Sequence, residues 1–213
     1  MSLTISMKNK SKFLLGLLAF IALAACALFV LTIHQRHRAA AFLREFASLQ
    51  IGATTFAEAQ DLANRYGAKA SGSRLKDPCS MKDCAFGFVF KNWLLNHFQR
   101  QREISLAAGI TVKDGYVISK QLDYSICATS GDRFMYILFD RVTPEKDKGY
   151  AIKRGMINPQ GMASVIEVDL GSNASAEVRK RAYSVDLACL SRVSGCDSLR
   201  DILPAYWSDF DVK

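Results

Sequence analysis

An uninterrupted run of apolar residues from Phe13 to Ile33 dominates the start of the sequence. As a helix that rises about 1.5 Å per residue, its 21 residues would span about 31 Å, close to the ~30 Å hydrocarbon core of a bilayer. The run continues beyond its alanine-rich middle, where the cleavage site of a secretory signal would be sought. It therefore predicts a single-pass transmembrane anchor over residues 13–33, preceded by a basic flank over residues 1–12.

Two helical patterns follow the anchor. Residues 34–50 predict a juxtamembrane helix that either continues the anchor helix or follows it after a bend. The apolar residues that share one face of this helix are Phe42, Leu43, Phe46 and Leu49. A second helix is predicted to end at Tyr66, because Thr55 and Glu58 have the spacing of a capping box and Gly67 suits a C-cap.

Beyond a polar stretch at residues 68–83, apolar and polar residues alternate with the period of two that is typical of strands. Asp114-Gly115 between two such runs indicates a tight hairpin, because both positions tolerate positive φ. Residues 153–161 have the composition of a loop, and Asp197–Leu203 predicts a short helix. The predicted strands are Phe86–Phe90, Ser105–Val112, Tyr116–Ile126, Arg133–Val142, Ser164–Leu170 and Ala182–Cys189.

This order of elements predicts an α+β protein. We expect an N-terminal transmembrane helix, then two helices packed on a largely antiparallel sheet of about six strands, and a short C-terminal helix. Both faces of the predicted strand Arg133–Val142 are apolar, which favours a central position in the sheet. Residues 51–213 would then form one extracytoplasmic domain.

The cysteines bear on which side of the membrane this domain lies. The spacing of Cys79 with Cys84, and of Cys189 with Cys196, favours two disulfides that close short loops in an oxidising compartment. Free buried thiols remain an alternative, whereas a zinc site would prefer shorter C-x2-C spacings. Cys127 is left over, either as a small buried residue or in another pairing. The basic residues on the two sides of the anchor are nearly balanced, so the cysteines decide the predicted orientation.

A second reading of the N-terminus depends on Leu23-Ala24-Ala25-Cys26, which resembles the lipobox of bacterial lipoproteins. Cleavage there would leave a lipidated Cys26 as the anchor. Apolar residues continue after Cys26, whereas a lipoprotein normally continues into a polar tether, so the uncleaved helix is the preferred interpretation.

Charge excludes one class of partner. The formal net charge is +8, but the basic residues are scattered and are not interleaved with aromatic residues as in a nucleic-acid platform. We therefore expect no nucleic-acid binding. The partners that the sequence favours are the membrane and a protein of the cell envelope.

The segment Leu49–Gly67 resembles the opening of the small outer-membrane assembly lipoprotein family of the SmpA/OmlA type. In that family a helix, a Gly-Met-Thr-like turn and a second helix precede a three-stranded antiparallel sheet. Segments that fall in the same order here are Phe86–Phe90, Ile110–Val112 and Tyr116–Val117. The likeness covers residues 40–120, although Ala53 replaces the usual Met and the cysteine pairs are foreign to the family. It implies binding or assembly work in the cell envelope, and it assigns no functional residue.

The sequence offers no convincing catalytic constellation, metal site or cofactor motif. It contains only three histidines, and His34 and His37 lie at the membrane edge beside arginines, which favours contact with lipid headgroups over a metal pair. A histidine-dependent active site would therefore have to use His97. The carboxylates expected on neighbouring strands have the placement of a solvated sheet surface: Glu167, Asp169 and Asp186.

Three functional hypotheses follow. The preferred one is a membrane-anchored extracytoplasmic domain for binding or assembly. A small-ligand sensor module is an alternative, with a pocket lined by Trp93, Tyr116 and Trp207. A hydrolytic or redox enzyme that uses Cys127 or the surface carboxylates is the other.

Overall fold

The computed structural model describes residues 7–72, 78–92, 103–128, 130–142, 149–156, 163–192 and 194–203. It confirms the α+β fold class with a curved, mostly antiparallel sheet of seven described strands in the order β1-β2-β3-β4-β5-β7-β6. β5 and β7 pair in parallel, and the other neighbours pair antiparallel. The strands are β1 Lys69–Ser71, β2 Asp83–Lys91, β3 Ile104–Lys113, β4 Tyr116–Cys127, β5 Arg133–Arg141, β6 Tyr150–Met156 and β7 Ala163–Leu170.

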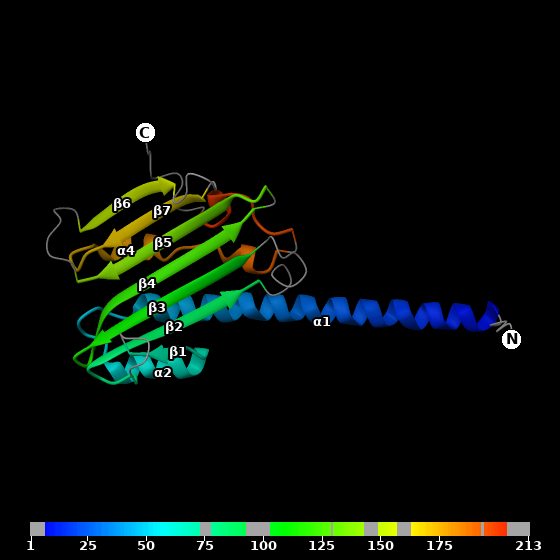
Figure 1. Ribbon diagram of the computed structural model, residues 1–213, viewed down its shortest axis with the longest axis horizontal. Coiled ribbons are helices and arrows are strands. Elements are labelled where there is room, and N and C mark those ends of the chain that lie inside the picture. Colours follow the sequence, from blue (N-terminus) through cyan, green and yellow to red (C-terminus); the bar gives the residue numbers. More distant parts are fainter. Residues whose placement is uncertain are drawn as a thin grey trace.

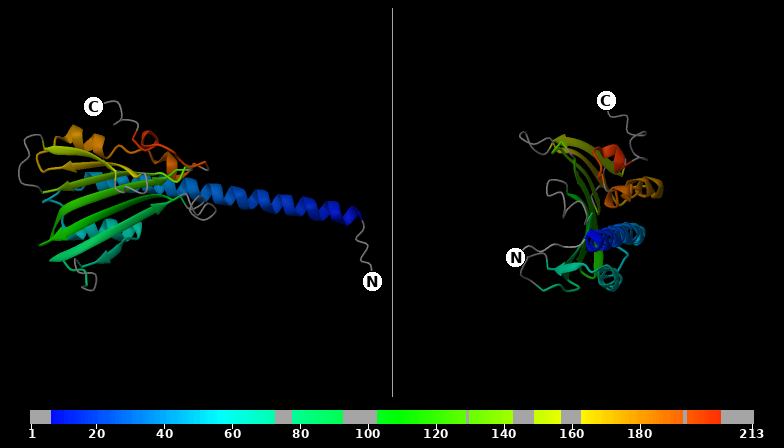
Figure 2. Two further views of the ribbon diagram at one scale, coloured as in Figure 1. Left: turned by 45° about the horizontal axis from the view of Figure 1, so that its top comes forward. Right: turned by 90° about the vertical axis from the view of Figure 1, so that its right-hand side faces the viewer.

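The described helices cover one face of this sheet and leave the other face open, as the end-on view in Figure 2 shows. The α-helices are α1 Met7–Ser48, α2 Phe56–Tyr66 and α4 Ala176–Ala182, and the 3-10 helices are η1 Leu187–Leu190 and η2 Leu199–Asp201. The core lies between these helices and the alternating apolar residues of β2, β3, β4, β5 and β7. The sheet therefore has one dry face and one face that is accessible.

Helix α1 is one unbroken helix of 42 residues, so the helix predicted over residues 34–50 continues the apolar helix before it without a bend (Figure 1). By length and composition, its segment from Lys12 to Ser48 could cross a membrane. Near its start the large apolar side chains are exposed, with Phe13 at 75%. Near its end Phe42 and Phe46 are fully buried against the sheet. The same helix is thus exposed and apolar at one end and part of the core at the other.

The predicted second helix is confirmed with its caps. Thr55 and Glu58 form the capping box of α2, and Gly67 ends the helix in the left-handed conformation with φ 69°. The predicted hairpin is also confirmed, because Asp114 and Gly115 have φ values of 51° and 86° between β3 and β4. Local signals of this kind fix a turn with little help from the rest of the fold.

The prediction of a strand over Ala182–Cys189 is wrong. Ser175 caps helix α4, which ends at Ala182, and the carboxylate of Asp186 accepts a hydrogen bond from the first turn of η1. Alternation over a few residues does not separate a strand from short helical segments, and here the side-chain caps decide.

Two strands were missed at the edges of the sheet, where a strand needs no apolar alternation. β6 overlaps the start of the stretch predicted as a loop at 153–161, and β1 lies in the polar stretch at 68–83. The short helix predicted over Asp197–Leu203 is present as the shorter η2, with Ser198 as its N-cap in place of Asp197.

Candidate functional site

The open face of the sheet carries small side chains at its centre. Gly87 on β2 lies directly opposite Gly109 on β3, and Ala85 lies opposite Thr111 in the next pair on the same face. Glycine and alanine are depleted in strands, since they add little packing and glycine loses the most conformational freedom on folding. A glycine inside a strand is typical of a place where a ligand or another backbone approaches closely.

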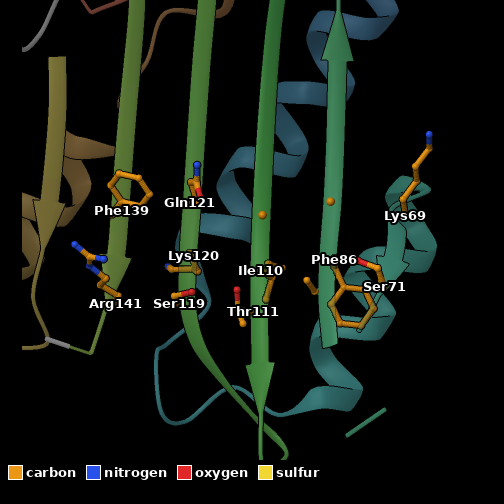
Figure 3. Close-up of a pocket in the computed structure, with 13 residues that line it drawn as sticks. Lys69, Ser71, Phe86, Ile110, Thr111, Ser119, Lys120, Gln121, Phe139 and Arg141 are labelled. Atoms are coloured by element: carbon orange, nitrogen blue, oxygen red, sulfur yellow. The ribbon is translucent and has the colours of Figure 1, made fainter. Parts of the chain in front are cut away.

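These residues form the floor of a groove that crosses β1 to β5 and has a volume of about 530 Å³. That volume lies within the range of small-molecule sites. Figure 3 shows Lys69 of β1 on one side of the floor, and Gln121 of β4 with Phe139 and Arg141 of β5 on the other.

Each side of the groove carries a cationic side chain, of which Arg141 is paired and Lys69 is exposed. The Arg141 guanidinium donates to Asp169 on β7, with an Nη2–Oδ2 distance of 2.7 Å and an Nε–Oδ1 distance of 3.2 Å. Its central carbon also lies 5.3 Å from the centre of the Phe139 ring, so both side chains are held in place. Lys69 is exposed and has no ion-pair partner in the part of the chain that the structure describes.

One carboxyl group lies beside the groove in a half-buried position. Asp123 follows Gln121 on the open face, and the Gln121 amide donates to its two oxygens at 2.9 and 3.2 Å. Burial raises the pKa of Asp123, and the hydrogen bond from Gln121 opposes that shift. The groove thus offers hydroxyls, amides and small apolar contacts, and its lining contains neither a histidine nor a cysteine.

A second cluster of polar residues lies on the opposite, buried face of the sheet. Lys120 is 2% exposed, and its ammonium donates to the backbone carbonyl oxygens of Leu49 at 2.7 Å, Phe46 at 3.3 Å and Ala47 at 3.4 Å. These carbonyls belong to the C-terminal end of α1, whose own last turn has no basic residue. Lys120 therefore caps α1 from the sheet and balances the negative end of its dipole.

Asp140 is the counter-ion of Lys120 in this cluster. Its carboxylate is fully buried, lies 3.3 Å from the Lys120 ammonium, forms an ion pair with Arg179, and accepts a hydrogen bond from the Tyr183 hydroxyl at 3.1 Å. Burial lowers the pKa of Lys120 to about 8, and the attraction of Asp140 opposes the shift. Each charge has partners, as buried charges require, so the cluster is best understood as a structural junction between α1, the sheet and α4.

The cysteines lie largely as predicted. Cys79 is bonded to Cys84, and Cys189 to Cys196. Cys127 is a half-buried free thiol at the end of β4, and Cys26 is a free thiol on the exposed part of α1.

The other predicted site residues do not converge. Glu167 and Asp169 lie on β7, but Asp186 precedes η1, so the predicted arrangement of three carboxylates on neighbouring strands is wrong. His34 and His37 are both exposed on α1. Tyr116 is half-exposed at the start of β4, whereas His97, Trp93 and Trp207 lie outside the described residues. Across the described ranges, no three His, Cys, Asp or Glu side chains are grouped so that they could hold a metal ion.

The buried cluster was not predicted from the sequence, although the strand pattern contained its signal. Lys120 is in phase with the buried Leu122 and Tyr124 of β4, and Asp140 is in phase with Tyr136 and Leu138 of β5. A charged residue in the apolar phase of a strand, repeated with the opposite sign on the next strand, indicates a buried ion pair.

A scan against models of protein families, a search of curated proteins and a search of solved structures found no match to this chain. Function must therefore be inferred from the geometry of the chain itself.

Proposed function

We propose that this protein is a membrane-anchored, extracytoplasmic binding module that holds a protein of the cell envelope on the open face of its sheet. The observation that carries the proposal is the double character of α1, which is apolar and exposed at one end and built into the domain core at the other. Such a projection would be unfavourable in a soluble domain, because the apolar side chains of Phe13, Phe20 and Leu23 would each face water at about 70% exposure.

The side of the membrane is supported by the two disulfides. Bonds that close short loops persist in oxidising compartments and are rare in the cytosol. The domain is therefore assigned to the far side of the membrane, and the basic residues Lys8, Lys10 and Lys12 to the cytoplasmic side.

The binding role is supported by the groove on the open face. Gly87 and Gly109 in its floor stabilise their strands less than larger residues would. Neither the backbone conformation nor the surrounding atoms require glycine at these two positions. A Cβ on Gly109 would approach only the Cβ of Gln121, at 4.0 Å, and a Cβ on Gly87 only the carbonyl oxygen of Lys69, at 3.8 Å. Neither glycine has a positive φ. Glycines that the fold does not require are consistent with a surface that leaves room for a bound partner.

The topology is tested by labelling intact cells with a membrane-impermeant thiol reagent. The variants carry Lys113→Cys or Lys12→Cys in a Cys26→Ala, Cys127→Ala background, and both lysines are exposed. We expect labelling of the Lys113 variant alone, with the protein in the membrane fraction. Labelling of the Lys12 variant alone, or recovery of soluble protein, would refute the proposed anchoring.

The binding face is tested by placing a photo-crosslinking amino acid at Gln121, on the open face. The matched control is Gln60, an exposed glutamine on α2 on the helical side of the sheet. We expect a discrete adduct with an envelope protein from Gln121, none from Gln60, and loss of the adduct when Gly109→Val fills the groove. Equal adducts from both positions, or an adduct that Gly109→Val leaves unchanged, would contradict the assignment of this face.

A further inference from the structure

The domain covers α1 before the apolar run of that helix ends. From Phe13 to Ala27 every residue of the helix is exposed, and this stretch is about 22 Å long at ~1.5 Å per residue. Leu28 is already half-buried and Thr32 is only 1% exposed, although the apolar run continues to Ile33. The freely exposed stretch alone is therefore too short for a hydrocarbon core of ~30 Å.

Between Leu28 and Thr32, the domain covers only one side of α1. Phe29, Val30 and Leu31 remain 51%, 63% and 54% exposed, although Leu28 and Thr32 at the same level are covered. One side of the helix thus contacts the domain where the other side presents large apolar groups outward. Thr32 also satisfies its hydroxyl within the helix, through the carbonyl oxygens of Leu28 and Phe29, as suits a position without water.

From this overlap we infer that the end of the domain from which α1 leaves lies in the lipid headgroup layer, so that the bilayer surface is a direct binding partner of the domain. The inference rests on the proposed membrane anchoring. The apolar run is long enough for the core only if the residues from Leu28 to Ile33 reach it, and Leu28 and Thr32 in that stretch are already covered by the domain. A tilted helix would need an even longer stretch and would increase the overlap. Basic side chains just beyond the run, at His34, Arg36 and His37, are exposed at the level where headgroup phosphates would lie.

The described elements at this end include the last residues of β2, the first of β3, the last of β4, the first of β5, and η1, which contacts α1 (Figure 1). The turn between β3 and β4 lies at the opposite end, about 30 Å away along a strand of ten residues. Two lysines mark the two ends: Lys91 is the last residue of β2 and Lys113 the last residue of β3, and the strands are antiparallel.

The test reconstitutes the full-length protein in vesicles of phosphatidylcholine and phosphatidylglycerol (3:1) that contain a lipid with a nitroxide on its headgroup. A fluorophore is attached at Lys91→Cys or Lys113→Cys in the Cys26→Ala, Cys127→Ala background. We expect at least twofold stronger quenching at Lys91 than at Lys113, since nitroxides quench only near contact. Equal, weak quenching at both ends, in protein that floats with the vesicles, would overturn the headgroup contact and leave the anchoring intact. Protein that does not float would instead refute the anchoring itself.

Discussion

The buried Lys120 makes a strong prediction about how α1 is held to the domain. Lys120→Met keeps the length and apolar stem of the side chain and removes the ammonium. Three carbonyl oxygens at the end of α1 lose their donor, and Asp140 keeps only Arg179 and Tyr183 as partners. The variant therefore tests whether the cap from the sheet stabilises the helix or is incidental.

The magnitude follows from burial. Removing one partner of a buried ion pair lowers the free energy of unfolding by roughly 3–5 kcal/mol, because the remaining polar groups are left desolvated. Arg179 and Tyr183 still serve Asp140, so we expect the lower end of this range. For a domain of this size, 1 kcal/mol corresponds to ~2–4 °C, so the melting temperature should fall by roughly 10 °C.

The assay is thermal unfolding of the full-length protein in detergent, followed by near-UV circular dichroism. Lys113→Met is the matched control, since Lys113 is exposed and should contribute within about 0.5 kcal/mol. A fall of less than ~2 °C for Lys120→Met, or an equal fall for the control, would refute the capping role.

The same residue predicts a pH dependence with a definite sign. Burial lowers the pKa of Lys120 to about 8 in the folded state, against 10.5 for an ordinary lysine. Between these values the unfolded chain binds more protons, so the free energy of unfolding should rise as the pH increases from 8 towards 10. Burial raises the pKa of Tyr183, and this group acts with the opposite sign only above pH 10. Lys120→Met should lack the rise, and an identical pH slope in both proteins would contradict the reasoning.

Further substitutions test the core and the backbone. Phe42→Ala should lower the free energy of unfolding by about 3–5 kcal/mol in denaturant titrations, since this buried ring contacts four other aromatic rings. Tyr124→Phe should leave stability unchanged or raise it by about 1 kcal/mol, because its buried hydroxyl has no hydrogen-bond partner among the described residues. Gly149→Ala should destabilise measurably, as the new Cβ would lie 2.8 Å from the Ala174 nitrogen at a φ of 69°.

The sequence predicted well those parts of the fold that local chemistry controls. The caps at Thr55 and Gly67 and the turn at Asp114-Gly115 are specified by a few adjacent residues, and they lie where the pattern placed them. The edge strand β6 was missed because its composition is typical of a loop. It forms a strand because it pairs with β7 on one side. The segment Ala182–Cys189 was misassigned as a strand because alternation over so few residues does not exclude short helical segments.

The candidate site was less accessible from sequence because it depends on register. Gly87 and Gly109 look like unrelated glycines until the pairing of β2 and β3 places them opposite each other. The ion pair of Lys120 with Asp140 likewise joins residues on neighbouring strands, and its third partner, Arg179, comes from a helix that the alternating pattern did not reveal. The likeness of residues 40–120 to the outer-membrane assembly lipoproteins stays a prediction, since nothing in the fold tests it.

The geometry of α1 also constrains how a partner would reach the groove. α1 runs along the helical face of the sheet and leaves it at one end, so the strands lie beside the C-terminal part of α1 and its apolar N-terminal part extends past them (Figures 1 and 2). If α1 crosses the bilayer as proposed, the sheet stands upright on the membrane, and its open face looks sideways along the surface. The groove would then meet neighbours that approach within the plane of the membrane. Because Lys120 ties the end of α1 to the strand that carries Gln121, the position of the groove relative to the bilayer would be fixed by the core of the domain.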